Sequence, residues 1–195
     1  MKIVIFGGTF DPWTSAHQEI VKRLSANFDK VLVIPTTVRY YKVNKQMFSF
    51  NERFTMAAKK VEGLTNVEMN DLERSVDDSW RFIDTLKKVI EQYGNENEYY
   101  VAIGSDSLQK FTTWHKWEEI LNLSKLVVFN RPGFTENFPN IPYEYLPMEN
   151  NISSSALRKK IVKFFTDEEF EDMLDEDWLL NGQKNLNENN DKEEL

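Results

Sequence analysis

The sequence contains no cysteine, which excludes disulfide bonds and metal sites built on thiolates. A chain of this kind suits a reducing compartment, so we expect a cytoplasmic protein. Long apolar runs are also missing, because no stretch approaches the ~20 residues that a membrane span needs. The N-terminus lacks the basic, apolar and small-residue regions of a signal peptide. We therefore expect no membrane association.

Positive charge is scarce as well. The chain has 24 lysine and arginine residues against 32 acidic residues, which gives a formal net charge of -8. This balance argues against a broad surface for a nucleic-acid polymer, because phosphate backbones need clustered lysine and arginine. A small anionic ligand is still compatible, since a local cationic pocket can lie on an acidic protein. The sequence is also compatible with a homo-oligomer.

The few glycines do not form either of two common phosphate-binding loops. Both G-x-G-x-x-G of the dinucleotide-binding dehydrogenases and G-x-x-x-x-G-K-[ST] of the P-loop enzymes are absent. Instead, an apolar run over residues 3–6 leads to Gly7 and Gly8, and a helical pattern begins near His17. A strand, a glycine turn and a helix N-terminus in this order point backbone N–H groups at one spot. We therefore predict a phosphate site there.

The rest of the chain alternates short apolar runs with amphipathic helical patterns. Strands are predicted over residues 30–35, 67–72, 99–103, 125–129 and 143–146. Helices are predicted from Ser49 to about Val61, over 82–93 with Asp78 or Ser79 as N-cap and Gly94 as the stop, around 117–121, and after Ser153 or Ser154. This alternation predicts an α/β fold, a Rossmann-like, doubly wound parallel sheet with helices on both faces.

We expect a single domain, because 195 residues fit one well-buried core. It is placed over residues 1–165. Residues 166–181 predict an acidic amphipathic helix, and residues 182–195 have almost nothing to bury and predict a disordered tail.

Ligands of parallel sheets bind at the carboxyl ends of the strands. Three segments of this chain follow predicted strands in that way: residues 7–17 after the first, Lys42 after the second and residues 104–106 after the fourth. The sequence therefore predicts one anion site to which several loops contribute.

The motifs at these positions resemble those of a known enzyme superfamily. Gly7-Gly8-Thr9-Phe10-Asp11-Pro12 followed by Thr14-x-x-His17 resembles the signature of the nucleotidyltransferase superfamily, GGTFDP and then [HT]-x-G-H. ISSSALR, residues 152–158, is similar to the ISSTxxR motif of the bacterial nicotinate mononucleotide adenylyltransferases. Residues 104–106, with Trp114 eight residues past the aspartate, resemble their GADxL…W segment. The resemblance covers residues 1–165.

This resemblance implies transfer of the adenylyl group of ATP to the phosphate of a pyridine mononucleotide, with release of pyrophosphate. It assigns His17, Thr14 and Arg158 to the triphosphate as catalytic residues, Gly8, Thr9, Phe10, Gly104, Asp106, Ser153 and Ser154 to ATP, and Lys42, Thr85 and Trp114 to the mononucleotide. Trp114 would stack on the pyridine ring, and Thr85 would contact its substituent. Mg²⁺ is the expected cofactor, bound mainly through the ATP phosphates. Two simpler alternatives stay open: Asp106 could only cap a helix, and Trp114 could belong to the core.

The chain departs from the family pattern at positions that bear on function. Thr14 stands where a histidine is usual, Ala16 stands where a glycine is usual, and residues 78–81 differ from the segment that helps recognise the pyridine substituent. Nicotinate mononucleotide is the expected acceptor, in NAD biosynthesis, and nicotinamide mononucleotide is the close alternative. The further alternatives are a phosphopantetheine adenylyltransferase, a cytidylyltransferase, or a catalytically impaired nucleotide-binding regulator.

Overall fold

The computed structural model describes residues 1–37, 47–130 and 138–148, together with Ser154 and Arg158. Within these residues, six strands form one sheet in the order β3-β2-β1-β4-β5-β6, and every neighbouring pair runs parallel. The strands are β1 (Lys2–Gly8), β2 (Lys30–Pro35), β3 (Val67–Met69), β4 (Glu98–Gly104), β5 (Lys125–Phe129) and β6 (Glu144–Leu146).

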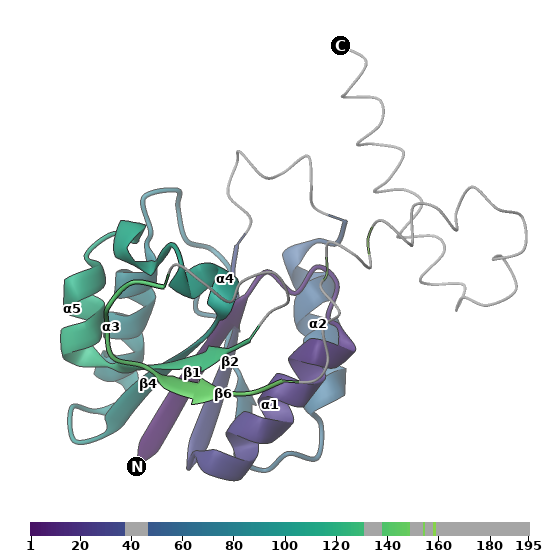
Figure 1. Cartoon of the computed structure of the whole chain (residues 1–195). Helices are drawn as coiled ribbons and strands as arrows, with labels where there is room; N and C mark the ends of the chain where they lie inside the picture. Colours follow the sequence, from purple (N-terminus) through teal and green to yellow (C-terminus); the bar gives the residue numbers. More distant parts are fainter. Residues whose placement is uncertain (38–46, 131–137, 149–153, 155–157, 159–195) are drawn as a thin grey trace, which may run out of the picture.

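Helices cover both faces of this sheet. They are α1 (Ser15–Asn27), α2 (Phe50–Val61), α3 (Phe82–Tyr93), α4 (Ser105–Leu108) and α5 (Trp117–Leu123), with a 3₁₀ turn at Phe111–Thr113. Figure 1 shows α1 and α2 on one face and α3 and α5 on the other. In the described part of the chain, no helix is long and apolar enough to cross a membrane.

The core consists of two apolar layers, one on each face of the sheet. Side chains alternate along each strand, so β1 places Val4 and Phe6 against α1 and α2. Ile3 and Ile5 of the same strand enter the layer that α3 and α5 close. Because its strands are buried on both faces, the sheet needs the continuous apolar runs seen in the sequence. The predicted doubly wound parallel sheet is confirmed.

The third strand is shorter than the predicted 67–72, because the Asn70 side chain ends it. Asn70 Oδ1 accepts from the Leu72 N–H over 2.9 Å, which folds the chain into a turn directly after Met69. The backbone N–H of Asn70 donates to the Val33 carbonyl over 2.9 Å. The chain therefore leaves the sheet near the carboxyl end of β2.

The N-cap predicted for the long helix is wrong. Asp77 Oδ1 accepts from the Ser79 N–H over 2.7 Å, so the polar residues before the helix form a turn of their own. Helix α3 begins at Phe82, and Asp84 Oδ2 accepts from the Arg81 N–H over 2.8 Å. The helix thus starts later than Asp78 or Ser79 would place it, and Arg81 stands just outside its first turn.

Several predictions lie outside the described residues. These are the chain around Lys42, Ser153, most of the helix that follows it, the acidic helix over 166–181 and the tail over 182–195. Of the helix after Ser153, the structure describes Ser154 and Arg158, which are both helical.

Candidate active site

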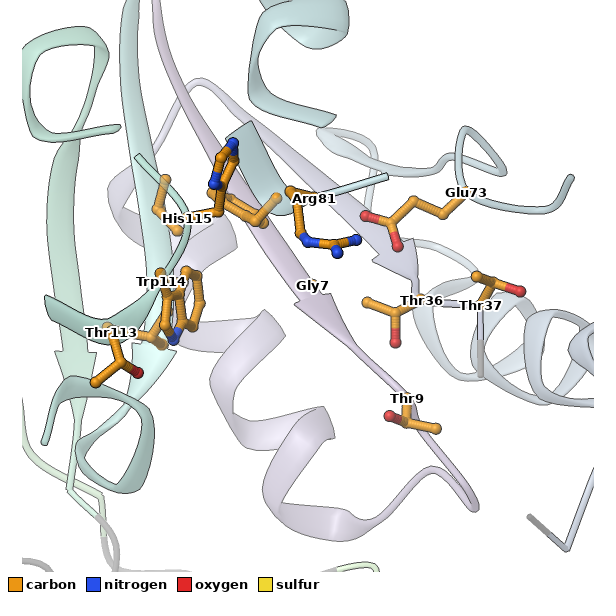
Figure 2. Close-up of a pocket in the computed structure, with 13 residues that line it drawn as sticks. Gly7, Thr9, Thr36, Thr37, Glu73, Arg81, Thr113, Trp114 and His115 are labelled. Atoms are coloured by element: carbon orange, nitrogen blue, oxygen red, sulfur yellow. The ribbon is translucent and has the colours of Figure 1, made fainter. Parts of the chain in front are cut away.

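A cleft of about 630 Å³ opens where the parallel strands end at their carboxyl side. Gly7 of β1, Thr36 after β2 and Ile103 of β4 contribute to its lining. The segments before α3 and after the 3₁₀ turn supply the remaining walls, including Arg81 and Trp114 (Figure 2). The cleft therefore lies at the edge of the sheet where the sequence predicts a ligand.

The turn after β1 is held in shape by aromatic packing. Phe10 has a φ of 51°, a left-handed conformation that non-glycine residues rarely adopt. Its buried ring contacts the rings of Phe6 and Trp13, with centroids 5.3 and 4.9 Å apart. A Cβ at Gly8 would lie 2.7 Å from the Phe10 ring, so glycine is required there. Thr9, between them, is exposed and lines the cleft.

His17 lies in the first turn of α1, and the residue that caps this helix holds its imidazole. The Thr14 N–H donates to His17 Nδ1 over 2.9 Å, and the Thr14 hydroxyl lies 3.1 Å from the same nitrogen. Because Nδ1 accepts from a backbone N–H, Nε2 carries the proton of the neutral ring and is a donor. The Thr14 hydroxyl also accepts from the His17 N–H over 3.4 Å. Thr14 therefore caps α1 and sets the tautomer of His17.

Ser154 and Arg158, two residues of the ISSSALR motif, contact the turn after β1. Ser154 Oγ donates to the Pro12 carbonyl over 2.9 Å, and Arg158 Nη1 donates to the Asp11 carbonyl. The Arg158 guanidinium also lies 3.9 Å from the Asp11 carboxylate. Two motifs about 140 residues apart in the sequence therefore meet at the N-terminus of α1.

Asp11 links this turn to the chain that leads into α2. It is 2% exposed, and its two carboxylate oxygens accept from the N–H groups of Met47 and Phe48, each over 2.9 Å. Burial raises the pKa of Asp11 above its usual value, while the two hydrogen bonds and the charges of Arg158 and Arg53 oppose the rise. The carboxylate thus serves as a structural link rather than as an exposed acid.

Arg53, a residue of α2, connects the same part of the structure through backbone carbonyls, where Asp11 uses backbone N–H groups. Its side chain is 1% exposed and, among the described residues, donates hydrogen bonds to three backbone carbonyls. Nη1 donates to Thr9 over 2.5 Å and to Thr36 over 3.0 Å, and Nε donates to Phe48 over 3.2 Å. Burial lowers the pKa of Arg53, and the Asp11 carboxylate opposes this. Arg53 therefore ties the loops after β1 and β2 to α2.

Trp114 provides an aromatic wall at another part of the cleft. Its ring packs against Phe82 and Phe111, with centroids 5.4 and 5.2 Å apart. The residue is half-buried and lines the cleft, so it belongs to the core and to the site at the same time. Both readings of Trp114 from the sequence are therefore compatible with its position.

Thr85 lies behind the cleft wall. It is 1% exposed, and its hydroxyl accepts from Trp80 Nε1 over 2.9 Å and donates to Glu73 Oε1 over 2.5 Å. Of these three residues, Glu73 lines the cleft. Thr85 therefore affects the cleft by orienting the Glu73 carboxylate.

The other predicted site residues fall into two groups. Gly104 ends β4 and Asp106 lies in the first turn of α4, at the same edge of the sheet as the cleft. Lys42 and Ser153 lie outside the described residues.

A match to a family model shows the protein family of the chain. Residues 5–160 match the model named cytidylyltransferase-like, which is most of the chain. The chain belongs to the cytidylyltransferase-like family. Members of this class are nucleotidyltransferases, so the resemblance that the motifs indicate is confirmed.

Relatives of this cytidylyltransferase-like chain share one name, probable nicotinate-nucleotide adenylyltransferase. The protein of that name from Fusobacterium nucleatum is 34% identical over 172 residues, which cover 83% of this chain and 88% of the relative. A relative from Campylobacter jejuni is 32% identical over 90% of this chain and 94% of its own length. One from Aliarcobacter butzleri is 30% identical over 95% of this chain and 100% of its own length.

Solved structures agree with the fold of this cytidylyltransferase-like chain. The nicotinic acid mononucleotide adenylyltransferase of Plasmodium falciparum complexed with NaAD gives a TM-score of 0.69 at 24% identity. The same enzyme complexed with APC gives a TM-score of 0.67 at 23% identity. In both cases 81% of this chain and 82% of the other are covered. At this level of identity, the likeness establishes the Rossmann-like fold.

Three side chains of this cytidylyltransferase-like site have no role in the prediction from sequence. Arg53 acts through backbone carbonyls that are distant in sequence. Nothing local marks Glu73, because its partner Thr85 is in another element. Arg81 falls inside the helix if that helix starts at Asp78 or Ser79, and only the later start places it at the cleft.

We expect Arg53→Met to lower the free energy of unfolding by about 2–5 kcal/mol, because it leaves buried carbonyls unpaired and removes the charge partner of Asp11. Denaturant unfolding measures this loss. Lys88→Met is the control, since Lys88 is exposed and pairs with Glu91 at the surface, and it should cost about 1 kcal/mol or less. Equal losses in the two variants would contradict the role given to Arg53.

Proposed function

We propose that the chain is a nicotinate-nucleotide adenylyltransferase, which transfers the adenylyl group of ATP to nicotinate mononucleotide in the biosynthesis of NAD. The observation that carries the proposal is the turn between β1 and α1, where Thr14 orients His17 and Arg158 donates to the Asp11 carbonyl. Thr9 of the same turn lines the cleft. The names of the relatives from Fusobacterium nucleatum and Aliarcobacter butzleri, over 83% and 95% of this chain, support it. The expected cytoplasmic location belongs to the same proposal.

The reaction exchanges one phosphoanhydride bond for another. An oxygen of the mononucleotide phosphate attacks the α-phosphorus of ATP and forms a P–O bond. The bond from this phosphorus to the bridging oxygen of the β-phosphate breaks, and pyrophosphate leaves with the electron pair. Because the attacking phosphate is already ionised, no protein base or nucleophile is needed. The enzyme has to hold two anions in line and stabilise the charge on the leaving group.

In this proposal the triphosphate binds at the N-terminus of α1. His17 donates to it from Nε2, because the Thr14 N–H occupies Nδ1. Arg158 adds positive charge from a position fixed by the Asp11 carbonyl. Thr14 contributes by orienting His17.

The proposal gives the rest of ATP and the acceptor phosphate to the other predicted residues. The backbone of Gly8, Thr9 and Phe10 lies against the nucleotide, Ser153 and Ser154 contact the β- and γ-phosphates, Gly104 and Asp106 contact the nucleoside, and Lys42 contacts a phosphate. The pyridine ring stacks on Trp114, and Thr85 acts on the ring substituent through Glu73.

Mg²⁺ fits this site as an ion carried by the substrate. Among the described residues, no group of three or more histidine, aspartate or glutamate side chains could hold a metal ion. The nearby Asp11 carboxylate is occupied by two backbone N–H groups. The ion would therefore take its ligands mainly from the ATP phosphates and water, and it would neutralise charge on the β- and γ-phosphates.

The Thr14 contacts argue against a catalytically impaired regulator. Thr14 replaces the histidine that is usual at its position, but its N–H and hydroxyl both engage His17. The substitution therefore leaves the remaining histidine oriented with a donor at Nε2. Nicotinamide mononucleotide stays as the alternative acceptor, since the segment before α3 is where the chain departs from the family pattern.

We expect the protein to release pyrophosphate and form the dinucleotide when it is given ATP, Mg²⁺ and nicotinate mononucleotide. A coupled pyrophosphate assay and chromatography of the products measure both quantities. Parallel reactions contain nicotinamide mononucleotide, phosphopantetheine, or ATP alone as a control for hydrolysis. No turnover with either pyridine mononucleotide would sink the proposal, and turnover with phosphopantetheine alone would replace it.

His17→Ala should lower kcat/KM by about 10²-fold or more, because it removes a preorganised donor to the leaving group. Lys22→Ala is the matched control, since Lys22 is an exposed residue of the same helix, and it should keep the wild-type rate. Steady-state kinetics with nicotinate mononucleotide compare the variants, and equal melting temperatures exclude misfolding. A rate for His17→Ala equal to that of Lys22→Ala would remove His17 from the mechanism.

A further inference from the structure

The guanidinium of Arg81 stands in the cleft just before α3. Arg81 is exposed and lines the same cleft as Glu73 and Trp114. Figure 2 shows its side chain directed into this space, with Glu73 on one side and Trp114 with His115 on the other. The chain has a net charge of -8, so a positive charge in the cleft gives an anionic group of a ligand a local binding partner.

The Arg81 side chain is fixed by its own turn. Nη1 donates to the carbonyls of Asp78 and Trp80, over 2.5 and 2.9 Å, and the Arg81 N–H donates to Asp84 Oδ2 over 2.8 Å. Within the described part of the chain, these are its hydrogen bonds, and its guanidinium forms no ion pair. The Nε and Nη2 edge is therefore left for a ligand, and such an edge matches a carboxylate with two parallel hydrogen bonds.

The neighbouring aromatic wall gives this edge a location relative to the pyridine ring. Phe82, the residue after Arg81, packs against Trp114 with ring centroids 5.4 Å apart. Arg81 is thus attached directly to the contact that supports Trp114. Trp114 and Arg81 line the same cleft, so one ligand could stack its ring on Trp114 and present the ring substituent to Arg81.

Glu73 places a carboxylate in the same cleft as Arg81. Its carboxylate is 6% exposed, lines the cleft and is held by the Thr85 hydroxyl over 2.5 Å. The negative charge of Glu73 repels a ligand carboxylate in the cleft, and pairing of that carboxylate with Arg81 opposes the repulsion. A carboxamide would meet no such repulsion, because its NH₂ group can donate to a carboxylate.

We propose that Arg81 selects the acidic form of the pyridine mononucleotide by pairing with the ring carboxylate. This inference rests on the proposed function, which supplies the pyridine acceptor. Arg81 is then the residue of this chain that separates nicotinate mononucleotide from nicotinamide mononucleotide.

Calorimetric binding of each mononucleotide, with and without a non-hydrolysable ATP analogue and Mg²⁺, tests the proposal in wild type, Arg81→Gln and Arg81→Lys. Arg81→Gln should weaken nicotinate mononucleotide on the order of 10- to 100-fold, the value of a charge-assisted pair. Nicotinamide mononucleotide should change by about threefold or less, since it forms no charged pair. Arg81→Lys, which keeps the charge without the fork, should fall between wild type and Arg81→Gln.

Arg74→Gln is the matched control, because that arginine lies in the same connecting segment, pairs with Asp71 and does not line the cleft. It should leave both affinities at the wild-type values. Equal weakening of the two mononucleotides by Arg81→Gln, or no change in either, would overturn the assignment.

The turnover assay separates this inference from the proposed function. A wild-type protein that prefers the acidic mononucleotide in binding, but does not release pyrophosphate, would contradict the proposed activity and leave the role of Arg81 supported. A protein that turns over both mononucleotides with a ratio unaffected by Arg81→Gln would contradict the role of Arg81 alone. A protein that binds neither mononucleotide would overturn both.

Discussion

Two buried charged side chains, Asp11 and Arg53, hold together the loops that follow β1 and β2. Asp11 accepts from two N–H groups of the chain entering α2, and Arg53 donates to carbonyls of both loops and of that chain. Leaving one buried backbone group unpaired costs about 1–3 kcal/mol, so a shift of any loop would break several bonds at once. The walls of the cleft depend on this arrangement.

In the proposed function, the turn that Asp11 and Arg53 fix places the phosphates at the N-terminal end of α1. Its N-cap, Thr14, directs its N–H and its hydroxyl to His17, and Arg158 donates to the Asp11 carbonyl. The phosphate end of the proposed site is therefore built from short-range capping plus the long-range contacts of Ser154 and Arg158. The acceptor end differs, because Trp114, Glu73 and Arg81 come from separate segments. Variation there can change the substrate while the phosphate end stays the same.

Periodicity and capping patterns were sufficient to predict most of the sheet and its helices, because each strand is buried on both faces. The motifs likewise predicted the turn at Gly8 and indicated His17 as a candidate site residue. Local patterns failed where a side chain serves a distant partner. Arg53 acts on carbonyls up to 44 residues away, and Arg81 reaches the cleft only because an aspartate turn delays the start of α3. Neither effect leaves a signal in neighbouring residues.

In the proposed function, the phosphates bind at the N-terminus of α1 and the pyridine ring binds in the cleft at Trp114. A crystal structure of the protein with the dinucleotide product bound tests this arrangement. We expect the bridging phosphates beside His17 Nε2 and Arg158, and the pyridine ring against Trp114 with its substituent toward Arg81. A dinucleotide with its ring outside this cleft, or with its phosphates away from the N-terminus of α1, would overturn the proposed binding mode.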